Sequence, residues 1–130
     1  MMLICAFVGM LLAEETVRSF GYLFVALSGI ALCSASAAAI NQVIDRNTDA
    51  LMTRTDQRPL PKGELSATHA SVFAFVIGVI GALILYFYVN TLTMILTIAS
   101  LIGYAFIYTI YLKRATPQNI VIGGLAGAAP

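Results

Sequence analysis

Charge is scarce in this 130-residue chain, because Asp, Glu, Lys and Arg together make up only 10% of it. A soluble domain typically carries about 25% charged residues. Apolar residues reach 60% and the mean hydropathy is +0.92, so the composition excludes an ordinary soluble domain and predicts an integral protein of the lipid bilayer. The formal net charge is only +1 and no basic cluster stands apart from the acidic residues, so we expect no nucleic-acid partner.

Cysteine and histidine are also scarce, and their positions do not match the spacing of a metal-binding motif. The two cysteines, Cys5 and Cys33, lie far apart in apolar runs, and we interpret both as buried thiols that act as small hydrophobic side chains. His69 is the single histidine and immediately precedes an apolar run, so we interpret it as an interfacial residue.

Long apolar runs predict an all-α fold, a bundle of several membrane-spanning helices. A spanning helix needs about 20 apolar residues. Three runs reach this length and two shorter runs lie at the ends, so we expect the N-terminal half of a longer protein with a single transmembrane domain. The full-length runs are residues 20–40, 70–89 and 92–112, and the partial ones are residues 1–13 and 119–130.

The positions of Lys and Arg predict how the bundle is oriented. Basic residues concentrate in the connections 41–69 and 113–118, whereas the turn at Asn90 carries no charge. Because basic connections stay on the cytoplasmic side, both basic connections are predicted to face the cytoplasm, or the matrix in a mitochondrion. We therefore expect a bacterial cytoplasmic membrane or a mitochondrial inner membrane.

Three oxygen-bearing side chains at four-residue spacing suggest a metal site. Asn41, Asp45 and Asp49 fall along one face of a helix that continues from the second span, about 6 Å apart per step. Two carboxylates this close repel each other, and a divalent cation would remove the repulsion. Mg²⁺ prefers oxygen ligands and is usually held by one or two carboxylates together with substrate phosphates.

Basic residues follow this acidic register within the same connection. Arg54, Arg58 and Lys62 are again four apart, and Pro59 and Pro61 prevent a continuous helix there. Guanidinium and ammonium groups bind phosphate oxygens, so the stretch is compatible with a cradle for a diphosphate. The alternative is a solvated loop that obeys the positive-inside rule, which would account for these three cations without any ligand.

Small residues and tyrosines mark two further faces. Ala74, Gly78 and Ala82 share one face of the third span, where they predict close helix packing. In the fourth span Tyr104, Tyr108 and Tyr111 would share one side of an α-helix, either for packing or as a wall that touches a flat or polyprenyl ligand. Their spacing of i, i+4 and i+7 predicts this shared side.

Two segments resemble a known family. The pattern N-x-x-x-D-x-x-x-D at Asn41, Asp45 and Asp49, followed by R-x-x-x-R-P at residues 54–59, resembles the first aspartate-rich motif of the UbiA-type intramembrane prenyltransferases. The run YTIYLKRATPQNIVIGGLAGAAP at residues 108–130 resembles the heme O synthases, or protoheme IX farnesyltransferases, within that superfamily.

This resemblance implies an enzyme that transfers a farnesyl group from farnesyl diphosphate to a vinyl group of heme b, giving heme O. It implies that Asp45 and Asp49 are catalytic, holding Mg²⁺ together with Asn41. A second aspartate-rich motif would lie beyond residue 130, so this chain alone is expected to be inactive. The substrate-binding residues implied are Asn41, Arg54, Arg58 and Lys62.

Two other functions stay open at this point. One keeps the fold and replaces heme b by an aromatic acceptor such as 4-hydroxybenzoate, although residues 108–130 favour heme. The other is a cation-binding fragment of a transporter, in which Asp45 and Asp49 would line a path through the membrane.

Overall fold

The computed structural model describes residues 2–13, 19–49, 51, 66–112 and 121, and it leaves the side chains of residues 48–49 and 108–112 undescribed. Within these ranges every regular element is a helix, which confirms the all-α prediction. The elements are α1 (Met2–Leu12), α2 (Phe20–Asp49), α3 (Ala67–Tyr88), α4 (Thr91–Ile102) and the π-helix η1 (Gly103–Leu112).

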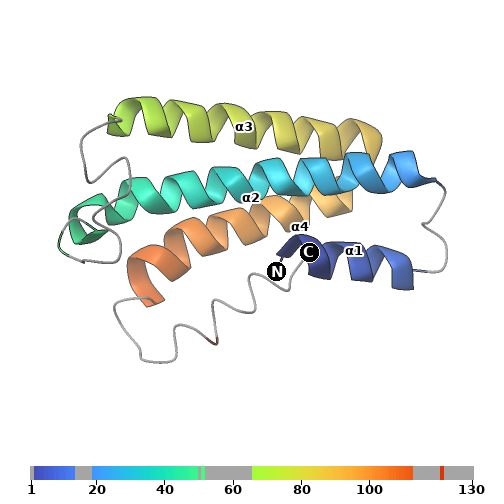
Figure 1. The fold of residues 1–130 in the computed structure, drawn as a ribbon, viewed down its shortest axis with the longest axis horizontal. Helices are drawn as coiled ribbons and strands as arrows, with labels where there is room; N and C mark the ends of the chain where they lie inside the picture. The colour runs from blue at the N-terminus through green and yellow to red at the C-terminus, as the bar shows by residue number, and fades with distance from the viewer. Residues whose placement is uncertain (1, 14–18, 50, 52–65, 113–120, 122–130) are drawn as a thin grey trace.

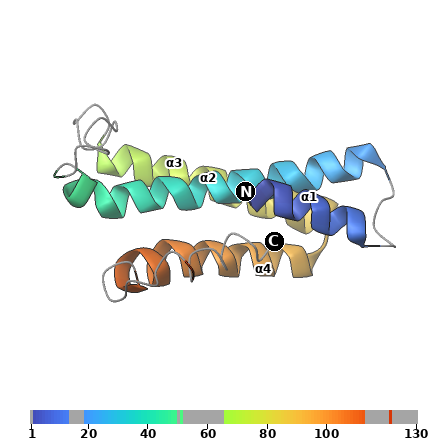
Figure 2. The ribbon, with the colours of Figure 1, turned by 60° about the horizontal axis from the view of Figure 1, so that its bottom comes forward.

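The antiparallel pair of α2 and α3 forms the centre of the structure, with the largest contact between any two elements (Figure 1). Helix α4 and its continuation η1 run parallel to α2, and α1 lies beside the N-terminal half of α2 (Figures 1 and 2). Helix α2 has 30 residues, a length of about 45 Å. It therefore exceeds the hydrocarbon core of about 30 Å and extends its last turns into the membrane interface.

Local sequence signals define where α3 and α4 begin. Ser66 caps α3, because its hydroxyl accepts a hydrogen bond from the backbone N–H of His69 at 3.2 Å. Asn90 caps α4 in the same way, with its side-chain oxygen accepting from the N–H of Thr93 at 2.7 Å. These caps satisfy N–H groups that have no partner inside the helix. The short link at Val89 and Asn90 makes α3 and α4 an antiparallel hairpin.

Glycines allow α2 and α3 to approach closely. A Cβ added to Gly81 would lie 2.9 Å from the carbonyl oxygen of Gly29 and 2.9 Å from the sulfur of Cys33. Nearby, the hydroxyl of Ser36 donates a hydrogen bond across the interface to the carbonyl oxygen of Ala74 at 2.7 Å. Small residues and interhelical hydrogen bonds are the main means of packing helices in lipid. The α2–α3 contact is therefore specified both by the small size of its glycines and by the hydrogen bond from Ser36 to Ala74.

Small residues on α3 occupy its interface with α2, as predicted for Ala74 and Gly78. Ala74 is fully buried, and a Cβ on Gly78 would lie 2.7 Å from the hydroxyl oxygen of Ser36. Gly81, which the sequence analysis did not single out, is also buried on this face, whereas Ala82 is half-buried, as Gly78 is.

The fourth span is continuous but changes its geometry. The predicted range 92–112 is helical throughout, and from Gly103 onward its hydrogen bonds follow the π pattern, five residues apart. The side chains of Tyr108 and Tyr111 lie outside the described part of the chain, so the shared face predicted for Tyr104, Tyr108 and Tyr111 stays a prediction.

Two helices, α2 over Phe20–Asn47 and all of α3, are long and apolar enough to cross a membrane. They overlap the predicted spans 20–40 and 70–89, with α2 continuing beyond residue 40. Helix α1 lies within the predicted partial span 1–13, and of the predicted partial span 119–130 only Val121 is described. Large apolar side chains on α3, such as Phe73 and Phe75, are exposed in the described structure, as expected for a surface that faces lipid.

Candidate functional site

Asp45 lies on the face of α2 that points into the helix bundle. Asp45 is only 2% exposed, although its side chain is polar and the helix that carries it is largely apolar. Ile30, Cys33 and Ala37 are buried on the same helix, and steps of three and four residues continue this face to Asp45. Asn41, one turn earlier, is half-buried. Asn41 and Asp45 therefore lie on the face of α2 that carries its buried residues, and Asp45 is shielded from bulk solvent.

The position along α2 explains how a carboxylate is tolerated there. Residues 20–40 already supply about 30 Å of helix, enough for the hydrocarbon core. Asn41 then lies at the edge of the core and Asp45 about 6 Å further out. Asn41 and Asp45 each have an interaction partner in the structure. Ionisable groups near a membrane interior that face a bundle are usually functional, because their burial is costly without such a purpose.

Asp49 is the last residue of α2, and its side chain is outside the description. Its backbone is helical, so it keeps the four-residue register with Asp45. The three cations predicted to contact phosphate, Arg54, Arg58 and Lys62, lie outside the described residues. Arg46, which is described, is exposed and off the acidic face.

The connection 41–69, expected to form the loop that carries the site, is helical over its first nine residues. Helix α2 continues to Asp49, Leu51 lies in a turn, and Ser66 already caps the next helix. Residues 41–49 contain neither glycine nor proline to end the helix. The asparagine and the two aspartates are thus carried on a rigid element, whereas the predicted phosphate contacts come from the segment that follows it.

The chemistry of the donors fits a hard divalent cation. Asn41 and Asp45 offer amide and carboxylate oxygens on one face, the ligand type that Mg²⁺ prefers. Among the described residues no group of three or more His, Cys, Asp or Glu side chains is clustered for metal binding. A protein-only cage is therefore not formed by this part of the chain. The donor set instead suits an ion that takes its other ligands from substrate phosphates and water.

Sequence reasoning missed one feature beside α2 and misplaced one thiol. It did not anticipate the π-helix, which packs against α2. Tyr104 within it, singled out from the sequence for packing or ligand contact, is half-buried and has an interaction partner. Cys33 is buried as predicted, but Cys5 is exposed in the described structure, because it lies on a side of α1 that no described helix covers.

A family model, described as the UbiA prenyltransferase family, matches residues 2–130. This chain belongs to the UbiA prenyltransferase family. Its two long apolar helices and its family together identify it as an integral membrane protein with a helical bundle. Asn41 and Asp45 of the N-x-x-x-D-x-x-x-D pattern lie on the inward face of α2 described above.

Curated relatives in this family cover the whole of the chain. It is 61% identical to protoheme IX farnesyltransferase 2 of Pseudoalteromonas atlantica, and 59% identical to the protoheme IX farnesyltransferases of Shewanella oneidensis and Idiomarina loihiensis. The 130 matched residues span 43% to 44% of the length of these relatives. No solved structure matches the chain significantly.

Proposed function

We propose that this UbiA-family chain contributes the first metal and diphosphate site of a heme O synthase, which transfers a farnesyl group from farnesyl diphosphate to a vinyl group of heme b. The observation that carries the proposal is the buried carboxylate of Asp45 on the bundle face of α2, in register with Asn41. The similarity to three protoheme IX farnesyltransferases supports this acceptor over others in the family.

The residues have distinct roles in this proposal. Asp45 and Asp49 would hold Mg²⁺, and Asn41 would contribute a carbonyl oxygen or orient a water ligand. Prenyltransferases of this family generally depend on a divalent metal, and the oxygen donors on α2 suit magnesium. When bound, the ion would neutralise charge on the departing diphosphate. Arg54, Arg58 and Lys62 are proposed to bind the diphosphate oxygens directly.

The transfer itself breaks and forms bonds in a defined order. The bond between C1 of the farnesyl group and the diphosphate oxygen breaks, and the electron pair leaves with the diphosphate. The vinyl group of heme b attacks the allylic cation to form a carbon–carbon bond. Water then adds to the vinyl carbon that has become electron-deficient, and its proton is released. The apolar spans beside Asp45 exclude other water and so protect the cation from early hydrolysis.

The proposed orientation places this chemistry at the inner surface of the membrane. The connection after α2 carries Arg54, Arg58 and Lys62, and basic connections are retained on the cytoplasmic side. The bacterial relatives support a cytoplasmic membrane over a mitochondrial one. Farnesyl diphosphate would then be taken from the cytoplasm, with its prenyl chain directed into the bundle.

The test uses the complete gene product in nanodiscs, supplied with farnesyl diphosphate, Mg²⁺ and either heme b or 4-hydroxybenzoate. We expect a hydroxyethylfarnesyl heme, identified by mass spectrometry, and no prenylated 4-hydroxybenzoate. Prenylation of the aromatic acid alone would overturn the proposed acceptor while keeping the family chemistry. If no diphosphate were released with either acceptor, the enzymatic proposal would be overturned and the transporter interpretation would remain. That interpretation predicts cation flux across the membrane of liposomes into which the protein is reconstituted.

A further inference from the structure

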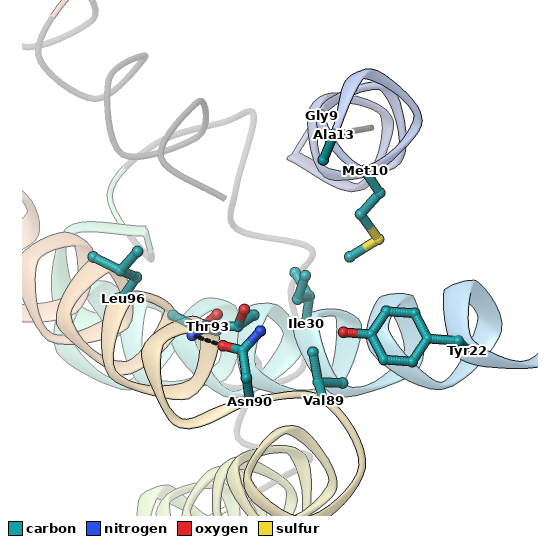
Figure 3. A pocket seen from close by; sticks show the side chains of 10 residues that line it. Gly9, Met10, Ala13, Tyr22, Ile30, Val89, Asn90, Thr93 and Leu96 are labelled. Carbon is teal, nitrogen blue, oxygen red and sulfur yellow. Dashed lines mark hydrogen bonds between the residues drawn. The ribbon is translucent and has the colours of Figure 1, made fainter. Parts of the chain in front are cut away.

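A cavity of about 300 Å³ lies at the opposite end of the bundle from Asp45. It is enclosed by the end of α1, the start of α2, the α3–α4 turn and the first turns of α4, as Figure 3 shows from close by. Its distance from Asp45 is about 22 Å along α2, measured from Ile30. The cavity is therefore separate from the candidate diphosphate site. The lining residues that matter here are Met10, Tyr22, Ile30, Asn90, Thr93 and Thr97.

One lining side chain is buried without a partner. Thr97 is only 5% exposed, and no hydrogen bond joins its hydroxyl to another residue in the described part of the chain. A buried hydroxyl left unsatisfied costs roughly 1–3 kcal/mol. Because this cost falls on a residue that faces a cavity, a bound molecule with an acceptor oxygen would remove it.

Other hydrogen-bonding groups converge on the same space. The hydroxyl of Tyr22 points along the cavity toward Ile30 (Figure 3). Asn90 uses its side-chain oxygen to cap α4 through the N–H of Thr93, which leaves its NH₂ group available as a donor. Together with the two threonine hydroxyls, these groups form a set that is rich in donors. Within the described ranges, the residues that line the cavity are all uncharged.

The apolar side of the lining argues against a cavity filled only by water. Met10 reaches in from α1, and Ile30, Val89 and Leu96 cover further surface (Figure 3). A buried water needs two to four polar partners, which this side does not offer. An amphiphile satisfies both sides, with acceptor oxygens toward the donors and hydrocarbon toward the apolar residues. At this volume, near the lower bound of about 300 Å³ for ligand pockets, the cavity admits part of a lipid and not the whole molecule.

Depth in the membrane identifies which part of a lipid fits. Tyr22 lies near the start of a spanning helix and Asn90 lies in the turn between two others, so both mark a membrane surface. The ester carbonyls of glycerolipids lie just below the headgroups and are acceptors only. We propose that this cavity binds the glycerol–ester region of a phospholipid from the leaflet opposite Asp45, with its carbonyls accepting hydrogen bonds from Tyr22, Asn90 and Thr97.

The test is photo-crosslinking of the complete gene product in phosphatidylcholine vesicles. The probe is a phosphatidylcholine that carries a diazirine next to the ester carbonyl, and mass spectrometry locates the attached lipid. We expect attachment within the peptides that contain Met10, Tyr22 or Val89. A second probe, with the diazirine at the end of the acyl chain, should not label these peptides.

Conservative variants separate lipid binding from folding. Thr97→Val and Tyr22→Phe keep shape and remove one hydroxyl each, and each should lower labelling by about three- to tenfold, the effect of one lost hydrogen bond. Thr91→Val is the matched control, because Thr91 is exposed on α4 outside the cavity, and its labelling should equal that of the unmodified protein. In lipid-free detergent, the midpoint temperature of thermal unfolding should be unchanged or higher for Thr97→Val.

Three results would overturn the proposal. The first is labelling of these peptides that does not respond to Thr97→Val and Tyr22→Phe. The second is equal labelling by the probe with a diazirine at the acyl-chain end. The third is the absence of attached lipid from all of these peptides. All three outcomes are independent of prenyl transfer, so they leave the proposed function unaffected.

Discussion

Adding one methyl group at Gly81 should test how α2 and α3 are held together. The new Cβ of Gly81→Ala would lie 2.9 Å from the carbonyl oxygen of Gly29 and 3.0 Å from the Cβ of Leu32. Carbon atoms in contact prefer about 3.5–4.0 Å. Because these atoms belong to the backbone of α2 or are attached to it, a side-chain rotation cannot relieve the contact, and the helices must move apart.

The expected magnitude follows from two opposing terms. Overpacking an interface costs about 1–3 kcal/mol, and replacing glycine by alanine within a helix contributes about 0.5–1 kcal/mol in the opposite sense. The net loss in unfolding free energy is therefore about 0–2.5 kcal/mol. Separation of the helices would also weaken the hydrogen bond of 2.7 Å from Ser36 to Ala74.

Gly103→Ala is the matched control. No heavy atom lies within 4 Å of a Cβ added there, and its φ of −57° and ψ of −47° suit any residue. This change should stabilise by about 0.5–1 kcal/mol. The free energies of unfolding can be compared by steric trapping of the complete gene product in bicelles. A Gly81→Ala protein as stable as Gly103→Ala would refute the close contact as described.

Three further substitutions test other parts of the account. Ser36→Ala should lower the unfolding free energy by about 0.6 kcal/mol, the mean for an interhelical hydrogen bond in a membrane, in the same steric-trapping assay. Cys33→Ser should leave farnesyl transfer nearly unchanged, because this thiol is buried at the α2–α3 interface; a large loss of turnover would mean that the site has been misassigned. Arg58→Lys should weaken diphosphate binding in titration calorimetry by about tenfold, since bidentate contact is lost, and unchanged affinity would exclude Arg58 from the site.

The inward face of α2 could be predicted from the sequence because two simple patterns coincide there. Asn41, Asp45 and Asp49 repeat every four residues, and residues 30–49 contain no glycine or proline. The structure places Asp45 on the buried face that this register implies. The roles of these residues in metal and substrate binding stay predictions.

Other features depend on contacts that a single segment does not reveal. Both Gly81 and Ala82 are small, so composition does not decide which of them meets α2. The change to a π-helix at Gly103 occurs within a uniformly apolar run, where no amphipathic period marks the register. The cavity beside Thr97 depends on three separate helices, although Thr93 and Thr97 already share a face at four-residue spacing.

Magnesium-dependent binding of an unreactive farnesyl diphosphate analogue, such as the thiodiphosphate, tests the metal site most directly. Asn47→Ala is the control, because Asn47 is exposed and points about 200° away from Asp45 around α2. In the complete gene product, Mg²⁺ should tighten binding for the unmodified protein and for Asn47→Ala, and should have little effect on Asp45→Asn. Full magnesium dependence in Asp45→Asn would contradict the assignment of this carboxylate to the metal.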